Sequence, residues 1–226
     1  VAKFNLGSIY TPPTVGQKDG KLGTLRPAIT GGVNWPGGAF DPETGLFYIY
    51  SKTELTNVSL VNNPDRSDMN YIFGLPEGVR RRDASTNIRG LPILKPPWGR
   101  ITAVDLTQGE IAWQVPHGEA PDNIKNHRLL GGMQLPKTGW PGRIGVLVTK
   151  TLAIAGDSAF HTTETGERGA MLRAYDKATG DEVGAVYMEA PQSGSPMTYM
   201  VDGTQYIVVA ASGGGQPGRL VAFRVP

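Results

Sequence analysis

The chain has 226 residues, of which 39% are hydrophobic and 19% charged, so it is long enough for a sizeable core and disorder is not expected. Its net charge of +2 does not indicate a nucleic-acid surface, and the absence of cysteine excludes disulfides and thiolate chemistry. No apolar run approaches the roughly 20 residues of a membrane helix.

Glycine and proline give the strongest local signal. The 31 glycines and 18 prolines stand between short apolar runs, which is typical of strands joined by turns. The sequence therefore predicts an all-β protein.

The first 141 residues combine predicted strands with long insertions. The chain starts at Val1 without an initiator Met or the layout of a signal peptide, so we expect a piece of a longer chain. Strands are predicted at residues 39–40 and 46–50. Insertions follow at residues 51–97 and 117–141, which lack sustained alternation. Loops of this length are expected to be functional or to cover a surface.

An eleven-residue pattern occurs twice, ending first at Trp113 and later at Gly184. Both copies read Ala-x-Asp-x-x-x-Gly, with the aspartate at Asp105 and Asp176. Such an aspartate accepts backbone N–H bonds in a turn while the glycine takes a positive φ. Each copy therefore predicts a β-hairpin, and Asp105 is interpreted as a turn former and not as a catalytic acid.

Further strands complete a repeating unit. They are predicted at residues 146–149 and 152–155, before the second hairpin, and at residues 197–201, 206–211 and 220–223, after it.

Four-stranded antiparallel units without a helical period favour a partial β-propeller over a sandwich or a solenoid. We predict one partial propeller domain over residues 1–226, with about three blades. The blades span residues 1–116, including a long insertion, residues 117–190, and residues 191–226, which form an incomplete blade. A partial array leaves an apolar face and an open edge at each end, so the remaining blades of a parent chain are expected partners.

Five segments resemble one family. They are the glycine-rich segment with Asn34 and Trp35, the hairpin that ends in Trp113, and residues 95–103, 145–150 and 196–203. Together they resemble the C-terminal blades of PQQ-dependent (quinoprotein) dehydrogenases, in the glucose and quinate dehydrogenase branch, over nearly the whole chain. The hairpin is similar to the tryptophan-docking motif of that family, whose propellers are eight-bladed.

The resemblance implies a cofactor site. In that family pyrroloquinoline quinone (PQQ) lies near the propeller axis with Ca²⁺, and the substrate is a sugar, polyol or alcohol. Asn34 matches the amide that reaches the quinone, where an N–H stabilises the negative charge that builds as hydride arrives. Trp35 would pack by the cofactor plane or wall the pocket. Outside this motif, the same pair would be an Asn in a turn followed by a core Trp.

Two positions depart from the family pattern. Gly184 stands where the second docking tryptophan is expected, which puts the docking of that blade in doubt, whereas Trp113 is predicted to pack between blades. Arg143 stands where relatives usually carry glycine. Its guanidinium would pair with one of the three PQQ carboxylates, or else Arg143 is an ordinary surface arginine.

The resemblance places the rest of the catalytic site upstream of Val1. The family's calcium ligands, its Asp base and its quinone-facing Lys or Arg belong to earlier blades, so no residue here is assigned as catalytic or as a metal ligand. The chain alone is expected to be inactive. The resemblance also implies a periplasmic dehydrogenase, with membrane-associated segments outside this chain left open, and a quinone or cytochrome as electron acceptor.

A second hypothesis is a non-catalytic propeller of the same repeat class, an outer-membrane assembly scaffold that binds proteins along its blade edges. Such a scaffold has no need for the segment around Asn34. Three histidines, His117, His127 and His161, lack a metal-binding spacing and are interpreted as satisfied or exposed.

Overall fold

The computed structural model describes residues 2–17, 20–27, 29–163 and 165–224. The helices whose bounds the structure describes are α1 (Asp122–Lys125) and the 3-10 turn η2 (Arg128–Leu130), and strands make up most of the regular structure, which confirms the predicted all-β class. Neither is long or apolar enough to cross a membrane. The chain divides into a smaller unit, Val1–Gly31 with Thr53–Lys95, and a larger unit, Gly32–Lys52 with Pro96–Pro226.

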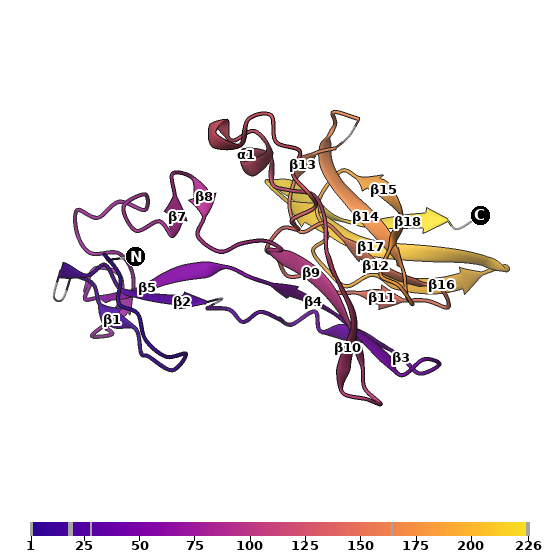
Figure 1. Cartoon of the computed structure of the whole chain (residues 1–226), viewed down its shortest axis with the longest axis horizontal. Coiled ribbons are helices and arrows are strands. Elements are labelled where there is room, and N and C mark those ends of the chain that lie inside the picture. Colours follow the sequence, from indigo (N-terminus) through magenta and orange to yellow (C-terminus); the bar gives the residue numbers. More distant parts are fainter. Residues whose placement is uncertain (1, 18–19, 28, 164, 225–226) are drawn as a thin grey trace. The chain divides into compact units, whose positions relative to one another are not determined.

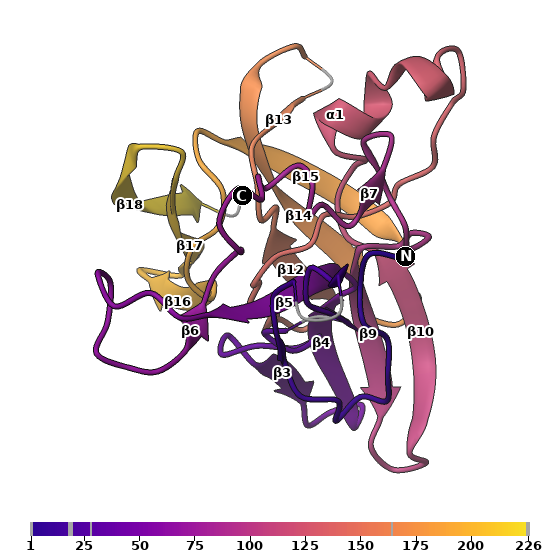
Figure 2. The same ribbon diagram turned by 90° about the vertical axis from the view of Figure 1, so that its left-hand side faces the viewer.

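The larger unit contains three antiparallel sheets that follow one another along the chain (Figures 1 and 2). The first sheet has the order β10-β9-β4-β3, with β3 (Gly38–Asp41), β4 (Leu46–Lys52), β9 (Gly99–Asp105) and β10 (Glu110–Pro116). The second runs β11-β12-β14-β15, with β11 (Leu147–Val148), β12 (Leu152–Gly156), β14 (Arg168–Asp176) and β15 (Glu182–Met188), and the short β13 (His161–Thr162) also pairs with β14. The third comprises β16 (Met197–Val201), β17 (Thr204–Gly213) and β18 (Gln216–Arg224).

The two sequence repeats form the predicted hairpins, β9–β10 and β14–β15. In the first, Asp105 Oδ1 accepts hydrogen bonds from the backbone N–H groups of Thr107, at 2.8 Å, and Gln108, at 3.2 Å, and Gly109 has a φ of +73°. In the second, Asp176 accepts two such bonds in the same way. Asp105 is therefore a turn former, as predicted.

The first and second sheets pack against each other through Trp113. Its indole N–H donates to the carbonyl oxygen of Lys177 at 3.0 Å, and the Tyr48 hydroxyl donates to the same oxygen at 3.0 Å. A Cβ on Gly180 would lie 2.7 Å from the indole, so the turn of the second hairpin packs directly against the ring. The prediction that Trp113 packs between blades is confirmed.

Around Trp113 the interface has an apolar core and one buried ion pair. The core residues are Tyr48, Tyr50, Ile101, Ala103, Trp113, Ile144, Val146, Ala153, Ala155 and Tyr175. Lys177 Nζ reaches Asp41 Oδ2 at 2.6 Å, and this hydrogen bond holds the pKa of the Asp41 carboxyl below its usual value. The first sheet is thus tied to the turn of the second sheet by both apolar and polar contacts.

The second and third sheets meet through a smaller apolar cluster. It consists of Ile154, Ala170, Leu172, Met188 and Val209. Gly184 lies on β15 opposite Ala174, as Trp113 lies on β10 opposite Ala103. No atom of the described residues lies within 4 Å of a Cβ built on Gly184. The position that holds an indole in the first sheet is therefore open in the second.

The smaller unit shows where the sequence interpretation was incomplete. Its strands are β1 (Thr14–Val15), β2 (Thr24–Pro27), β5 (Leu55–Val61), β6 (Ile72–Phe73), β7 (Asn87–Ile88) and β8 (Leu91–Pro92). The seven-residue β5 lies within the predicted insertion 51–97 and pairs antiparallel with β2 and parallel with β1. The predicted blade boundaries at residues 116 and 190 stay a prediction.

Candidate functional site

Asn34 and Trp35 lie in the segment that leads into β3, the edge strand of the first sheet that lies beside β11. Asn34 Oδ1 accepts a hydrogen bond from the Trp35 backbone N–H at 2.9 Å. Gly37, whose φ is +67°, donates its N–H to the Asn34 carbonyl at 3.0 Å and closes a tight turn. The turn fixes the amide and the indole next to each other at the start of β3.

Trp35 is 97% exposed, which excludes the interpretation of this residue as a core tryptophan. An exposed indole offers a large planar surface against which a planar ligand can stack. Its exposure agrees with the prediction that it packs by a planar ligand.

Arg143 lies in the corresponding segment before β11, and its side chain is exposed. In the described part of the chain, no hydrogen bond or ion pair involves this guanidinium. Its neighbour Ile144 is buried in the core between the first and second sheets. On its other side, a Cβ on Gly142 would overlap the Ser158 side chain. The Arg143 backbone is thus held by its neighbours while the guanidinium faces solvent.

Trp35, Arg143 and Ser195 occupy equivalent positions before the first strands of the three sheets. Trp35 and Ser195 stand six residues before Asp41 and Val201, the last residues of β3 and β16. Arg143 stands six residues before Thr149, which directly follows β11 and donates its N–H to the Leu152 carbonyl of β12. The sequence interpretation missed Ser195, although this common spacing from the strand end could have found it.

The three segments also contact one another. The Ser195 hydroxyl donates to the Pro36 carbonyl at 3.5 Å, and a Cβ on Gly145 would overlap the Ser195 side chain. The segments that carry Trp35, Arg143 and Ser195 therefore form one continuous surface, which we call the pre-strand wall.

A buried cluster of charged side chains lies next to Ser158, which contacts the segment that carries Arg143. Asp157, next to Ser158, accepts hydrogen bonds from Arg173 Nε at 2.8 Å and from His161 Nε2 at 2.7 Å. Burial opposes ionisation, but the bonds from His161 and Arg173 outweigh it and hold the pKa of Asp157 far below its usual value. The Ser158 hydroxyl lies 3.5 Å from the carbonyl oxygens of Trp140 and Pro141.

The other two histidines also have structural roles. His117 is buried and donates from Nε2 to the Gly156 carbonyl at 2.9 Å, so its Nδ1 accepts from the Tyr175 hydroxyl, also at 2.9 Å. Burial lowers the pKa of His117, so its ring is neutral. His127 accepts a bond from the Leu129 N–H at the start of η2. The interpretation of all three histidines as satisfied or exposed is confirmed.

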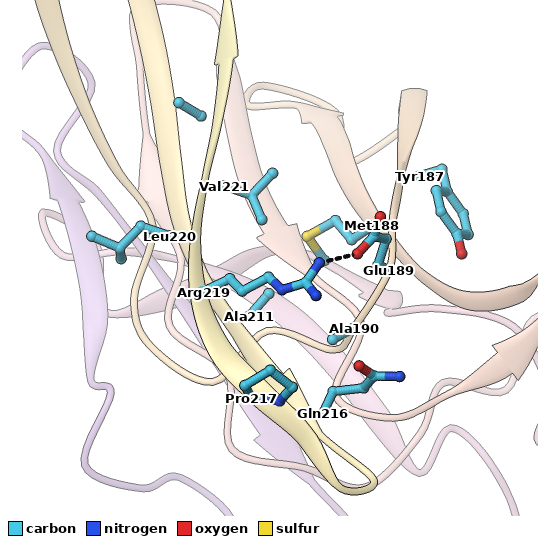
Figure 3. Close-up of a pocket in the computed structure, with 11 residues that line it drawn as sticks. Tyr187, Met188, Glu189, Ala190, Ala211, Gln216, Pro217, Arg219, Leu220 and Val221 are labelled. Atoms are coloured by element: carbon cyan, nitrogen blue, oxygen red, sulfur yellow. Dashed lines mark hydrogen bonds and ion pairs between the residues drawn. The ribbon is translucent and has the colours of Figure 1, made fainter.

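A separate pocket of about 470 Å³ lies between the end of β15 and β18. Figure 3 shows Arg219 reaching across it to an ion pair with Glu189. Its remaining lining is mostly apolar or small, including Met188, Ala211 and Val221. The residues predicted to touch a cofactor do not line it.

In the described part of the chain, no group of three or more His, Cys, Asp or Glu side chains is arranged to hold a metal ion. The expectation that calcium ligands lie upstream stays a prediction.

The pre-strand wall has the chemistry that a planar polycarboxylate requires. It presents an aromatic face at Trp35, a guanidinium at Arg143 and an amide at Asn34, and its glycines allow close approach of the backbone. PQQ is a planar quinone with three carboxylates, so the groups of the wall fit it.

Known proteins resemble this chain over most of its length. The family model described as "Glucose/ethanol/alcohol dehydrogenase, beta-propeller domain" of the PQQ type matches residues 1–207. Quinoprotein glucose dehydrogenase A of Acinetobacter calcoaceticus shares 29% sequence identity with this chain, in an alignment that covers 99% of this chain and 28% of that protein. Quinate/shikimate dehydrogenase (quinone) of Acinetobacter baylyi shares 28% identity, in an alignment that covers 84% of this chain and 24% of that protein.

Solved structures show the same fold. The quinohemoprotein alcohol dehydrogenase ADHIIG of Pseudomonas putida HK5 superimposes with a TM-score of 0.55 at 23% identity, covering 89% of this chain and 25% of that one. The corresponding enzyme of Comamonas testosteroni gives a TM-score of 0.51 at 21% identity, with 89% of this chain and 28% of that one covered. This chain therefore spans about a quarter of the length of its relatives.

These matches confirm the predicted partial propeller and the predicted resemblance. The family model covers far more than half of the sequence. The chain belongs to the PQQ-dependent glucose/ethanol/alcohol dehydrogenase β-propeller family.

Proposed function

We propose that this chain forms one wall of the quinone site in a PQQ-dependent dehydrogenase that oxidises a sugar, polyol or alcohol. The observation that carries the proposal is the pre-strand wall, where an exposed tryptophan and an exposed arginine stand at equivalent positions in adjacent sheets. The relatives named as glucose, quinate and alcohol dehydrogenases support it.

Each wall residue has a distinct role in this proposal. Trp35 contacts the plane of the cofactor, and Arg143 pairs with one of its carboxylates. Asn34 donates an amide hydrogen bond toward a quinone oxygen and stabilises the negative charge that develops there. When bound, PQQ supplies the quinone that takes up hydride from the substrate alcohol.

The remaining components are proposed to come from outside residues 1–226. They are the Ca²⁺ ligands, the base that takes the alcohol proton, and the contacts to a quinone or cytochrome acceptor. We place the protein in the periplasm, as the resemblance implies. The scaffold hypothesis is less favoured, because the relatives are named as dehydrogenases and the wall carries the groups a quinone needs.

The first test measures PQQ binding to the full-length protein that contains this chain. Arg143→Gln is expected to weaken PQQ binding by about tenfold, since a hydrogen bond to a charged group contributes about 1.5–3 kcal/mol. Asn34→Ala is expected to lower both PQQ affinity and turnover. Arg168→Gln is the control, because it removes another exposed arginine of the second sheet, on β14. Unchanged affinity in both Arg143→Gln and Asn34→Ala would contradict the assignment.

The second test measures activity. The full-length protein, supplied with PQQ, Ca²⁺ and an artificial electron acceptor, is expected to oxidise at least one member of a panel of sugars, quinate and alcohols. If PQQ neither binds nor supports oxidation of any of them, the scaffold hypothesis would replace the dehydrogenase.

A further inference from the structure

The segment that carries Arg143 has little backbone support of its own. Residues 141–146 precede β11 and belong to no strand. In the described part of the chain, this stretch forms no backbone-to-backbone hydrogen bond outside the sheets. Its position is therefore set by its own buried side chains, Ile144 and Val146, and by side chains that reach it from other elements.

One of these side chains is the buried amide of Gln192, which is only 5% exposed. Its Nε2 donates to the Gly145 carbonyl at 2.9 Å, and its Oε1 accepts from the Gly156 N–H at 2.5 Å. The Gln192 backbone N–H also donates to the Asp157 carbonyl at 3.0 Å. One residue therefore connects the Arg143 segment to the end of β12.

The chemistry of this position suits glutamine. The amide must accept at one end and donate at the other, and a carboxylate or an aliphatic side chain cannot do both. Space is also limited, because a Cβ on Gly156 would lie 2.9 Å from Gln192 Cβ. Gly145 itself lies against Ser195, three residues after Gln192. The amide thus sits where two segments of the wall meet.

We propose that Gln192 is a positioning residue for the PQQ site. By holding the Gly145 carbonyl, it fixes the backbone two residues after Arg143 and keeps that guanidinium in register with Trp35 and Ser195. This inference rests on the proposed function and on the contact between Arg143 and PQQ. Gln192 acts through Arg143 and does not itself touch the cofactor.

The test is a double-mutant cycle in the full-length protein, with PQQ affinity measured by titrating PQQ and Ca²⁺ into the apoprotein. Gln192→Leu is expected to weaken PQQ binding by about tenfold, because releasing the Gly145 carbonyl lets the Arg143 guanidinium shift away from its carboxylate partner. In an Arg143→Gln background the same substitution is expected to have no further effect, because both changes remove one contact. An equal loss in both backgrounds, or no loss, would overturn the proposal.

Gln114→Leu serves as the control. Gln114 also donates from its side-chain amide, to Thr102 Oγ1 at 2.8 Å, but it is exposed and lies on β10. Its removal is expected to leave PQQ affinity unchanged. If it weakens PQQ binding as much as Gln192→Leu does, the effect is general to hydrogen-bonded glutamine side chains of the sheets and the proposal fails.

A second variant covers the case in which Gln192→Leu does not fold. Gln192→Glu keeps an acceptor for the Gly156 N–H, but donates to the Gly145 carbonyl only when protonated, and burial raises the pKa of such a carboxyl. PQQ affinity relative to the wild type is expected to recover on acidification. Affinity that stays low at every pH would overturn the proposal.

The same measurements separate the two levels of inference. If Asn34→Ala weakens PQQ binding while Arg143→Gln does not, the proposed function stands and the positioning role falls. If neither affects binding, the proposed function falls first.

Discussion

The two contacts between neighbouring sheets differ most at one repeated position. Between the first and second sheets, Trp113 packs on the Gly180 turn and donates to Lys177, whereas Gly184 leaves the matching position in the second sheet open. Both hairpins nevertheless form with the same aspartate turn. The tryptophan is therefore not needed to form a hairpin, and its role is to dock one sheet on the next.

The second contact also differs in what surrounds it. Its apolar cluster is smaller, and the pocket of about 470 Å³ lies along it, crossed by the exposed ion pair of Arg219 and Glu189. An exposed ion pair contributes little to stability. The first contact, with a buried lysine–aspartate pair and two bonds to one carbonyl, is expected to be the stronger.

The largest effect is expected for Trp113→Ala in the full-length protein. Removing the buried indole is expected to cost about 3–5 kcal/mol and to lower the melting temperature. Ile111→Ala is the control on the same strand, because Ile111 is 62% exposed, and it should change the free energy of unfolding by less than about 0.5 kcal/mol. Equal losses in both variants would show that docking by Trp113 is unimportant.

The buried His117 adds a pH dependence to the first contact. Because burial lowers its pKa in the folded state, the unfolded chain binds a proton that the folded chain does not as the pH falls below about 6.5. The free energy of unfolding is therefore expected to fall with the pH in that range, by at most about 1.4 kcal/mol per pH unit. Thermal melts from pH 7.5 to 5 measure it.

In that series, His117→Gln should flatten the dependence. If His117→Gln keeps the full slope, another group is responsible.

The smallest effect is expected for Gly184→Trp, which gives the second hairpin the residue of the first. The open space at Gly184 accepts the side chain, so the free energy of unfolding should change by less than about 1 kcal/mol. Gly180→Trp is the contrast, because Gly180 has a φ of +80° and lies against Trp113. If Gly184→Trp destabilises as strongly as Gly180→Trp, the position is not open.

Local patterns predicted the three sheets well. The alternation and turn residues around Asp41, Asp105 and Asp176 act within a few positions, so β3, β4 and the two hairpins were found where predicted. Strand β5 was missed because its partners, β1 and β2, lie more than 25 residues earlier in the chain. A strand that depends on such remote pairing leaves only a weak signal in its own sequence.

The site shows the same division. Asn34, Trp35 and Arg143 could be nominated from motifs, and the exposure of the last two agrees with a binding role that stays to be tested. The role of Gln192 could not be predicted, since its two partners, Gly145 and Gly156, meet it only in the folded chain.

The carbonyl oxygen of Lys177 accepts from both Trp113 and Tyr48, so a single peptide group in one repeat serves two side chains of the repeat before it. Inserting or deleting one residue in the turn from Asp176 to Gly180 would displace that oxygen and release both donors together. The length of this turn is consequently constrained by its neighbour as well as by its own hairpin. A blade of this protein would therefore be swapped into another propeller successfully only together with its neighbour, so that the turn from Asp176 to Gly180 and Trp113 of the preceding blade are transferred together.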